Sequence, residues 1–96
     1  MNTKEQLKKN AEFVLAKFTD NFEITKVTPF EEVIDEELGN DLEFSFEIKG
    51  IPLTVTVSSD DYVDLWRDDI NAGMGFPIED LKGSHFFENI NKQIKL

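Results

Sequence analysis

Carboxylates are the residues whose type and spacing most suggest chemistry in this chain. Eight lie between Lys26 and Lys49, a stretch without a basic residue: Glu31, Glu32, Asp35, Glu36, Glu37, Asp41, Glu43 and Glu47. A second group follows at Asp60, Asp61, Asp64, Asp68 and Asp69, interrupted only by Arg67. Residues 29–80 hold two basic residues against fifteen acids, a charge of −13, whereas the flanking segments carry +1 and +2. Such a field attracts basic partners and repels nucleic acid.

Three of the aspartates have a spacing that would align them on a helix. Asp60, Asp64 and Asp68 are four residues apart, so on a helix they would form a line with steps of about 6 Å. Phosphates along a nucleic-acid strand have a comparable spacing, with roughly one charge per 3.4 Å of axis. The row therefore predicts a binding surface for a basic groove. The candidate partner-binding residues are Asp60, Asp61, Asp64, Asp68 and Asp69, together with Glu43 and Glu47. The alternative is a solvated acidic face that serves only solubility.

Other kinds of chemistry find little support in the sequence. Calcium loops need alternating acidic or amide residues and a central Gly, and neither 60–64 nor 36–41 has that pattern. His85 is the only histidine, and if protonated at a helix start it would oppose the positive end of the helix dipole. Phosphate-binding loops, nucleophile elbows and cofactor fingerprints are absent from the sequence. We therefore expect a protein that is not an enzyme and that holds no metal and no cofactor.

Length and composition indicate one compact domain spanning residues 1–96. The chain is 40% hydrophobic and contains nine Phe, one Trp and no Cys. This aromatic content separates it from acidic disordered chains, and the lack of cysteine excludes disulfides and thiolate chemistry. The first residues lack the apolar core of a signal peptide, and no apolar run has the length of a membrane span. We expect a cytoplasmic protein.

The first third of the chain predicts a helix and a strand, followed by an ambiguous segment. Residues 4–19 have one apolar face at helical spacing, with Thr3 as N-cap and Gln6 completing a capping box. Residues 22–28 are rich in β-branched and aromatic residues and predict a strand. Residues 29–38 fit a short helix ending at Gly39, but also a strand that turns at 37–40. The helix is favoured, although acids would crowd its negative end.

A β-hairpin is the clearest local pattern. Leu42, Phe44, Phe46 and Ile48 alternate with polar residues, as do Leu53, Val55 and Val57. With Lys49-Gly50 as a two-residue loop, Phe46 faces Leu53, Phe44 faces Val55 and Leu42 faces Val57, all on one side of the sheet. Pro52 has no N–H to donate, so we expect it at an unpaired site or at a sheet edge.

The remaining third predicts helices. Ser58 or Ser59 would cap a helix that ends at Gly73, and its buried stripe would be Tyr62, Val63, Trp66 and Ile70. Tyr62 and Trp66 are expected in the core, with interface anchors as the alternative. Residues 74–83 would form a connection with one helical turn at 78–82. Ser84 would cap a last helix that buries Phe86, Phe87, Ile90 and Ile94.

These elements predict an α+β fold. It would consist of a small antiparallel sheet of about three strands, an N-terminal helix and two C-terminal helices, with the helices on one face of the sheet. Small size, strong acidity, lack of cysteine and this element order resemble phage-encoded inhibitors of bacterial defence, in particular anti-CRISPR proteins that mimic DNA. The resemblance covers the whole chain in outline, and it implies action in a host cytoplasm on the DNA-binding face of a Cas effector.

The expected function is therefore that of an acidic inhibitor. It would occupy a basic, nucleic-acid-handling surface of a partner protein, such as a nuclease, and would itself bind neither nucleic acid nor membrane. Two alternatives stay open. One is an immunity protein that neutralises a basic toxin, and the other is a small phage or bacterial protein whose acidity serves only solubility.

Overall fold

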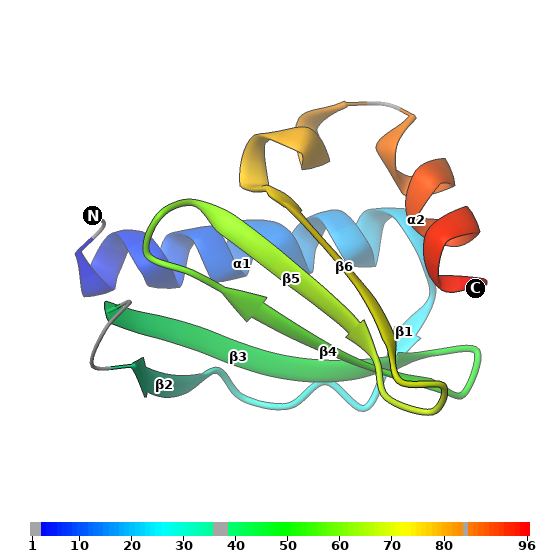
Figure 1. Cartoon of the computed structure of the whole chain (residues 1–96), viewed down its shortest axis with the longest axis horizontal. Coiled ribbons are helices and arrows are strands. Elements are labelled where there is room, and N and C mark those ends of the chain that lie inside the picture. Colours follow the sequence, from blue (N-terminus) through cyan, green and yellow to red (C-terminus); the bar gives the residue numbers. More distant parts are fainter. Residues whose placement is uncertain (1–2, 36–38, 84) are drawn as a thin grey trace.

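The chain folds into one antiparallel sheet with helices packed on it (Figure 1). The computed structural model describes residues 3–35, 39–83 and 85–96. Its elements in chain order are α1 (Lys4–Asn21), β1 (Ile24–Thr25), β2 (Glu31–Asp35), β3 (Gly39–Ile48), β4 (Ile51–Val57), β5 (Tyr62–Arg67), β6 (Ala72–Pro77), the 3-10 helix η1 (Ile78–Lys82) and α2 (Phe86–Ile94). The α+β class is confirmed. The expected count of about three strands is wrong, because the sheet has six.

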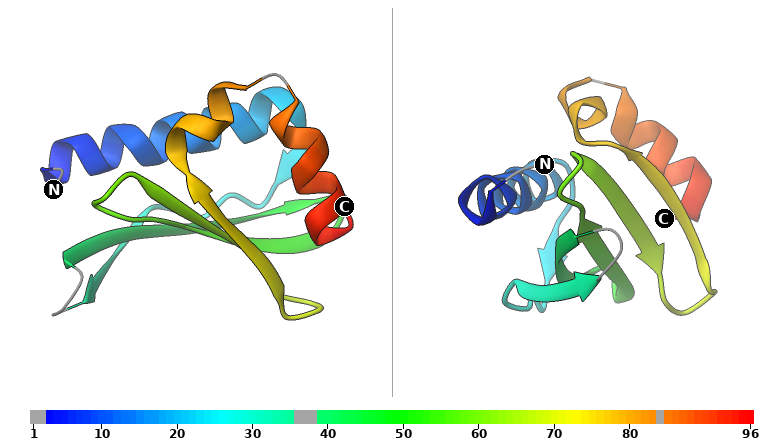
Figure 2. Two further views of the ribbon diagram at one scale, coloured as in Figure 1. Left: turned by 45° about the horizontal axis from the view of Figure 1, so that its top comes forward. Right: turned by 60° about the vertical axis from the view of Figure 1, so that its left-hand side comes forward.

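The sheet is built around the long strand β3. The strand order is β1-β3-β4-β5-β6, and β2 also pairs with β3, so that β1 and β2 share the same edge of β3. The connections from β3 to β6 are short hairpins, and all pairings are antiparallel. Helices α1, η1 and α2 lie on the same side of this sheet (Figure 2, left). The molecule therefore has two layers, with the core between the helices and one face of the sheet.

Helix α1 forms where the periodicity predicts it. The Thr3 hydroxyl accepts a hydrogen bond from the Gln6 amide at 3.2 Å, which confirms the N-cap. The Gln6 side chain donates to Asn10 at 3.0 Å, so it does not complete the capping box. The stripe of Leu7, Ala11, Val14 and Phe18 is buried. The Phe18 ring lies 5.3 Å from that of Phe46 in β3 and 5.4 Å from that of Phe87 in α2, so one residue joins three elements.

The β3–β4 hairpin has the register that the alternation predicts. Phe46 pairs with Leu53, Phe44 with Val55 and Leu42 with Val57, and these side chains are buried. The turn residues Lys49 and Gly50 have φ of 54° and 79°, as a two-residue primed turn requires. Pro52 lies in an interior strand, so the edge position is wrong. It is nevertheless at the start of β4, opposite Asp68, where β5 has already ended.

Two expected helices are strands instead. Residues 31–35 pair with 39–43 as β2, so the helix at 29–38 is wrong, and Gly39 begins β3 and does not end a helix. The expected strand over 22–28 is limited to Ile24–Thr25. Pairing with β3 satisfies the backbone of β2 without placing acids at the negative end of a helix. Of the alternative turn at 37–40, residues 37 and 38 lie outside the described residues, and Gly39 and Asn40 are the first residues of β3.

The second expected helix, from Ser58 or Ser59 to Gly73, is wrong and is replaced by the hairpin of β5 and β6. Val63 and Leu65 are buried, whereas Tyr62, Trp66 and Ile70 are exposed. This is the period of two of a half-buried strand. Gly73 lies within β6 opposite Trp66.

The expected pair of C-terminal helices is wrong, although the second of them forms. The helical turn at 78–82 forms as η1, a 3-10 helix, and α2 is the one C-terminal α-helix of the described residues. Phe87, Ile90 and Ile94 are buried and Phe86 is half-buried. The expected N-cap Ser84 lies outside the described residues.

Candidate protein-binding surface

The side of the sheet that no helix covers forms a continuous surface, which we call the open face. Alternate residues of a strand point to opposite sides, and the positions opposite the buried ones are half-buried or exposed. The open face consists of Asp41, Glu43, Ser45 and Glu47 of β3, Pro52, Thr54 and Thr56 of β4, Tyr62, Asp64 and Trp66 of β5, and Gly73 and Gly75 of β6. These strand residues include four acids and no Lys or Arg. Asp68, just after β5, adds a fifth acid through its hydrogen bond with Thr54, and Glu31 of β2 lies opposite Glu43.

Four of the predicted partner-binding residues meet on this face. Glu43, Thr56 and Asp64 are successive partners across β3, β4 and β5, so Glu43 and Asp64 are about 10 Å apart at the backbone. Glu47 pairs with Pro52, and the Pro52 carbonyl accepts the Asp68 amide at 3.1 Å. The Asp68 carboxylate is on the same side, because it accepts from the Thr54 hydroxyl at 2.8 Å.

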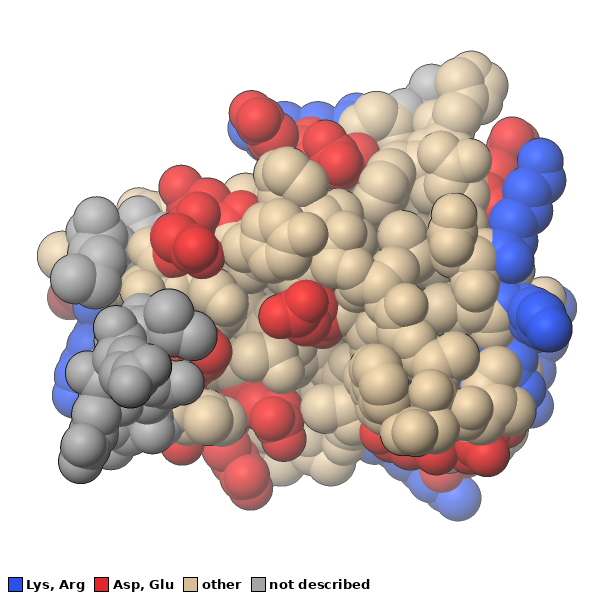
Figure 3. All heavy atoms as spheres, in the orientation of Figure 1, with Lys and Arg blue, Asp and Glu red and all other residues tan. Residues whose placement is uncertain are grey.

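These four carboxylates form the corners of an area of about 10 by 13 Å at the backbone. We call Glu43, Glu47, Asp64 and Asp68 the acidic frame. Trp66 and Thr54 lie between the corners, because they pair with each other two residues along both strands from the pair of Asp64 and Thr56. In Figure 3, which has the orientation of Figure 1 with β5 and β6 in front of α1, carboxylates lie across the middle and basic side chains lie at the margins.

The corners of the frame differ in their neighbours. Glu47 has an ion pair with Lys26 at 3.4 Å, and Asp68 accepts the hydrogen bond from Thr54. The carboxylate of Asp64 has no hydrogen bond or ion pair with any described residue. Glu43 faces another acid, Glu31 of β2, directly across the strand pair. Like charges in such positions destabilise a sheet, so the fold tolerates a cost here that a basic residue at either position would remove.

The straight row of aspartates expected from the sequence is wrong. Asp60, Asp64 and Asp68 are not on a helix, because Asp60 lies in the β4–β5 turn and Asp64 lies in a strand. Residues four apart along a strand are separated by about 13 Å, roughly twice the helical step. The match to consecutive phosphates therefore loses its geometric basis. In the folded chain the carboxylates of β3 and of β5 with its C-terminal end are spread over an area of the sheet and do not form a single line.

The other predicted residues lie at the two ends of the sheet. Asp60 and Asp61 are in the β4–β5 turn, and Asp61 has a left-handed φ of 63°. Its carboxylate accepts from the Asn10 side chain at 2.9 Å, which ties this turn to α1. Asp69 is in the β5–β6 turn and is paired with Arg67 at 2.7 Å. Asp61 and Asp69 thus have structural roles through these contacts, whereas Asp60 is exposed.

Arg67 connects the end of β5 to the end of α2. Its side chain is 13% exposed. It donates through Nε and Nη2 to the two oxygens of Asp69, and through Nη1 to the carbonyls of Ile94 and Lys95 at 2.9 and 2.7 Å. Cations at a helix C-terminus satisfy its free carbonyls and its dipole. The Arg67–Asp69 pair therefore fixes the last turn of α2 against the sheet.

This pair predicts a pH dependence of stability. The hydrogen bond from Arg67 holds the pKa of the Asp69 carboxyl below its ordinary value. A depressed pKa in the folded state stabilises the fold above the unfolded pKa of about 3.9, and this stabilisation is lost as the pH falls through the folded pKa. We expect Asp69→Asn to melt below wild type at neutral pH and to approach it at about pH 2. A melting-temperature difference that is constant from neutral to acid pH would contradict this.

Two aromatic residues of β5 are exposed on the open face. Trp66 is 42% exposed and Tyr62 is 39% exposed, so their expected place in the core is wrong. Their rings lie over the two glycines of β6. A Cβ atom at Gly73 would overlap the Trp66 ring, and one at Gly75 would lie 2.7 Å from Cε2 of Tyr62. The signal for this arrangement was present in the sequence as buried Val63 and Leu65 at a spacing of two, followed by two glycines at the same spacing.

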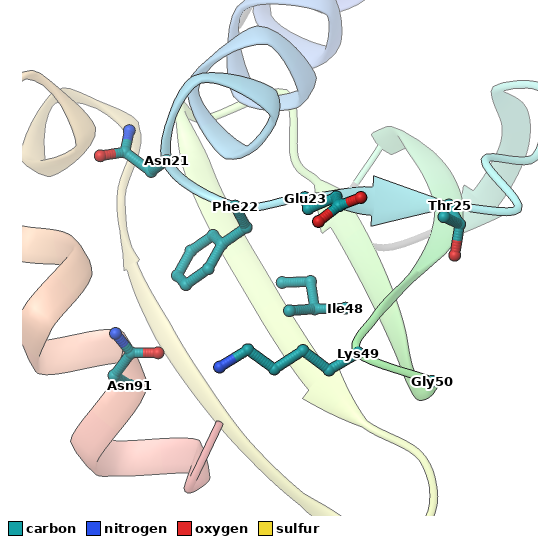
Figure 4. Close-up of a pocket in the computed structure, with 8 residues that line it drawn as sticks. All are labelled: Asn21, Phe22, Glu23, Thr25, Ile48, Lys49, Gly50 and Asn91. Carbon is teal, nitrogen blue, oxygen red and sulfur yellow. The ribbon is translucent and has the colours of Figure 1, made fainter.

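Another hollow lies away from the open face, between the end of α1, β1, the β3–β4 turn and α2. It has a volume of about 550 Å³ and is lined by Asn21, Phe22, Glu23, Thr25, Ile48, Lys49, Gly50 and Asn91. Figure 4 shows the Lys49 side chain pointing toward the Asn91 amide, past Phe22 and Ile48. None of the predicted partner-binding residues lines it.

Nothing in the described residues gathers a metal site, since no three His, Asp or Glu side chains come together there. A search of the same residues finds no helix long and apolar enough to cross a membrane. Comparison with protein-family models, with curated proteins and with solved structures finds no match to this chain.

Proposed function

We propose that this chain is an acidic binding protein that inhibits a partner by covering a basic, nucleic-acid-handling surface with its open face. The observation that carries the proposal is the exposure of Trp66 and Tyr62 inside and beside the acidic frame. Acidity alone would fit a surface that serves only solubility. Large aromatic side chains in solvent add nothing to solubility, whereas Trp and Tyr are enriched among the residues that dominate binding energy at interfaces.

The two kinds of residue have different roles in this proposal. The carboxylates of the acidic frame attract a basic surface over a distance, which raises the association rate and makes it fall with salt. The aromatic rings supply apolar area that is removed from water once contact is made. Nucleic acid would be excluded by competition for the same basic side chains. This competition depends on negative charge and not on a phosphate-like spacing of the carboxylates.

The test compares two variants of equal charge. One carries amides at the frame (Glu43→Gln, Glu47→Gln, Asp64→Asn and Asp68→Asn). The other carries four amides at exposed acids of α1 and α2 (Glu5→Gln, Glu12→Gln, Asp20→Asn and Glu88→Gln). We expect wild type and the helical-side variant to capture the same basic nucleic-acid-binding protein from a bacterial lysate at low salt. We expect the frame variant to lose it.

The captured partner is then purified for a direct measurement. Wild-type protein should displace duplex DNA from it in a gel-shift assay, with an apparent affinity that falls steeply as salt rises. The frame variant should displace DNA at least about tenfold less well, which corresponds to about 1.4 kcal/mol. Equal displacement by the frame variant and wild type would refute the open face as the binding surface.

A further inference from the structure

Tyr62, Asp64 and Trp66 form a compact group on the open face. They occupy alternate positions of β5, so all three side chains project to the same side. The opposite positions of β6 are Gly75, which pairs with Asp64, and Gly73, which pairs with Trp66. Because these glycines lack side chains, the rings of β5 lie across β6 and do not stand upright.

The carboxylate of Asp64 lies between the two rings. A Cβ atom built at Gly75 would be 2.9 Å from Oδ1 of Asp64 and 2.9 Å from the hydroxyl oxygen of Tyr62. The Tyr62 ring and the Asp64 carboxylate therefore meet above the same glycine, and the Trp66 ring covers the next one. Beside them is a hollow of about 400 Å³ lined by Asp64, Leu65, Trp66, Gly73, Met74 and Gly75.

We infer that this group is a recognition site for an arginine side chain of the partner protein. A guanidinium group is planar, stacks on aromatic faces and donates paired hydrogen bonds to a carboxylate. Both oxygens of the Asp64 carboxylate are available to such a donor, because this carboxylate has no hydrogen bond or ion pair with any described residue. The one arginine of the chain, Arg67, lies on the opposite side of β5 and is bound to Asp69.

Arginine is favoured over lysine by the shape of the group. An ammonium is a compact, strongly hydrated charge that gains little from lying flat against a ring, whereas a guanidinium can contact a ring face and a carboxylate at once. Of the other corners of the frame, Glu47 is paired with Lys26 and Asp68 accepts a hydrogen bond from Thr54. The cross-strand neighbours of Glu43 are Glu31 and Thr56, so no aromatic residue is opposite it. The uncompensated carboxylate between two rings is thus a specific feature of β5.

The inference rests on the proposed function and is tested with defined peptides. Octa-arginine and octa-lysine carry the same charge, so a purely electrostatic face binds them alike. Trp66 is the only tryptophan, so its fluorescence reports directly on the site. We expect octa-arginine to change Trp66 emission saturably and to bind about fivefold to tenfold more tightly than octa-lysine at about 0.15 M salt.

Variants show which residues cause the preference for octa-arginine over octa-lysine. Asp64→Asn should bring the two affinities within about twofold of each other, whereas the charge-matched Glu12→Gln should keep the preference for arginine. Trp66→Leu, followed by calorimetry, should reduce the preference in the same way. Circular dichroism of each variant checks the fold, and Asp64→Asn carries the test if Trp66→Leu does not fold.

The outcomes separate this inference from the proposed function. Equal affinity of wild type for both peptides, together with loss of both in the four-amide frame variant, would overturn the arginine site and still support the acidic face. An arginine preference that survives in Asp64→Asn would also overturn it. Failure of wild type to bind either peptide, even at low salt, would contradict both proposals.

Discussion

Replacing Phe46 by alanine is expected to lower the free energy of unfolding by about 3–5 kcal/mol. Phe46 is 2% exposed and lies in β3, the strand that pairs with β1, β2 and β4. Its ring is 5.3 Å from that of Phe18 in α1 and 6.1 Å from that of Phe44. Truncation would remove this contact between the two layers and leave a cavity that the surrounding strands cannot fill. Urea unfolding of both proteins gives the difference.

An exposed residue of similar chemistry provides the control. Ile70 lies in the β5–β6 turn and is 46% exposed, so Ile70→Ala should change stability by less than about 0.5 kcal/mol. A loss below about 1 kcal/mol for Phe46→Ala would mean that the two layers do not meet at this residue.

Adding one methyl group at Gly73 is expected to cost about 1–3 kcal/mol, although Gly→Ala usually favours an extended strand. The new Cβ would overlap the Trp66 ring and would lie 2.8 Å from the carbonyl oxygen of Leu65. The ring can swing into solvent, but the carbonyl belongs to the β5 backbone, so the two strands must move apart. Thermal unfolding of Gly73→Ala measures the loss of stability, and Trp66 fluorescence reports the displacement of the ring.

The neighbouring glycine gives a matched comparison. At Gly75 the three atoms nearest to an added Cβ atom belong to the side chains of Tyr62 and Asp64. These can rotate away, so Gly75→Ala should cost less than Gly73→Ala by about 1 kcal/mol or more. If the two variants are equally stable, the close approach of β6 to the Leu65 carbonyl is not a constraint on the fold.

Sequence reasoning succeeded where one physical signal dominated. The helix after Thr3 and the register of Phe44 with Val55 follow from long, consistent periodicities, because burial of one face leaves no second solution. The two-residue turn at Lys49-Gly50 predicts the same hairpin register. These elements set the first helix and the centre of the sheet.

The prediction from sequence was wrong for the segment of β5 and β6, where the spacing of the charged residues competes with the apolar alternation. Aspartates are depleted in strands, and Asp60, Asp64 and Asp68 fit a helical row, so Tyr62 and Trp66 were placed in a core. The alternation of Val63 and Leu65 is only two residues long and competes poorly with that pattern. Four of the candidate residues, Glu43, Glu47, Asp64 and Asp68, share one face of the sheet, and their role in binding stays a prediction. Their arrangement follows from strand pairing between β3, β4 and β5, which no local pattern of Asp residues encodes.

The placement of all helices on one face has a consequence for the order of events during biosynthesis. Helix α1 leaves the ribosome before the strands and α2, because chains emerge from their N-terminal end. Its buried stripe nevertheless packs against β3, β4 and η1, and Phe18 also meets Phe87 of α2. An isolated amphipathic helix of 18 residues is only marginally stable in water. The apolar side of α1 therefore stays uncovered until the strands and α2 have also emerged.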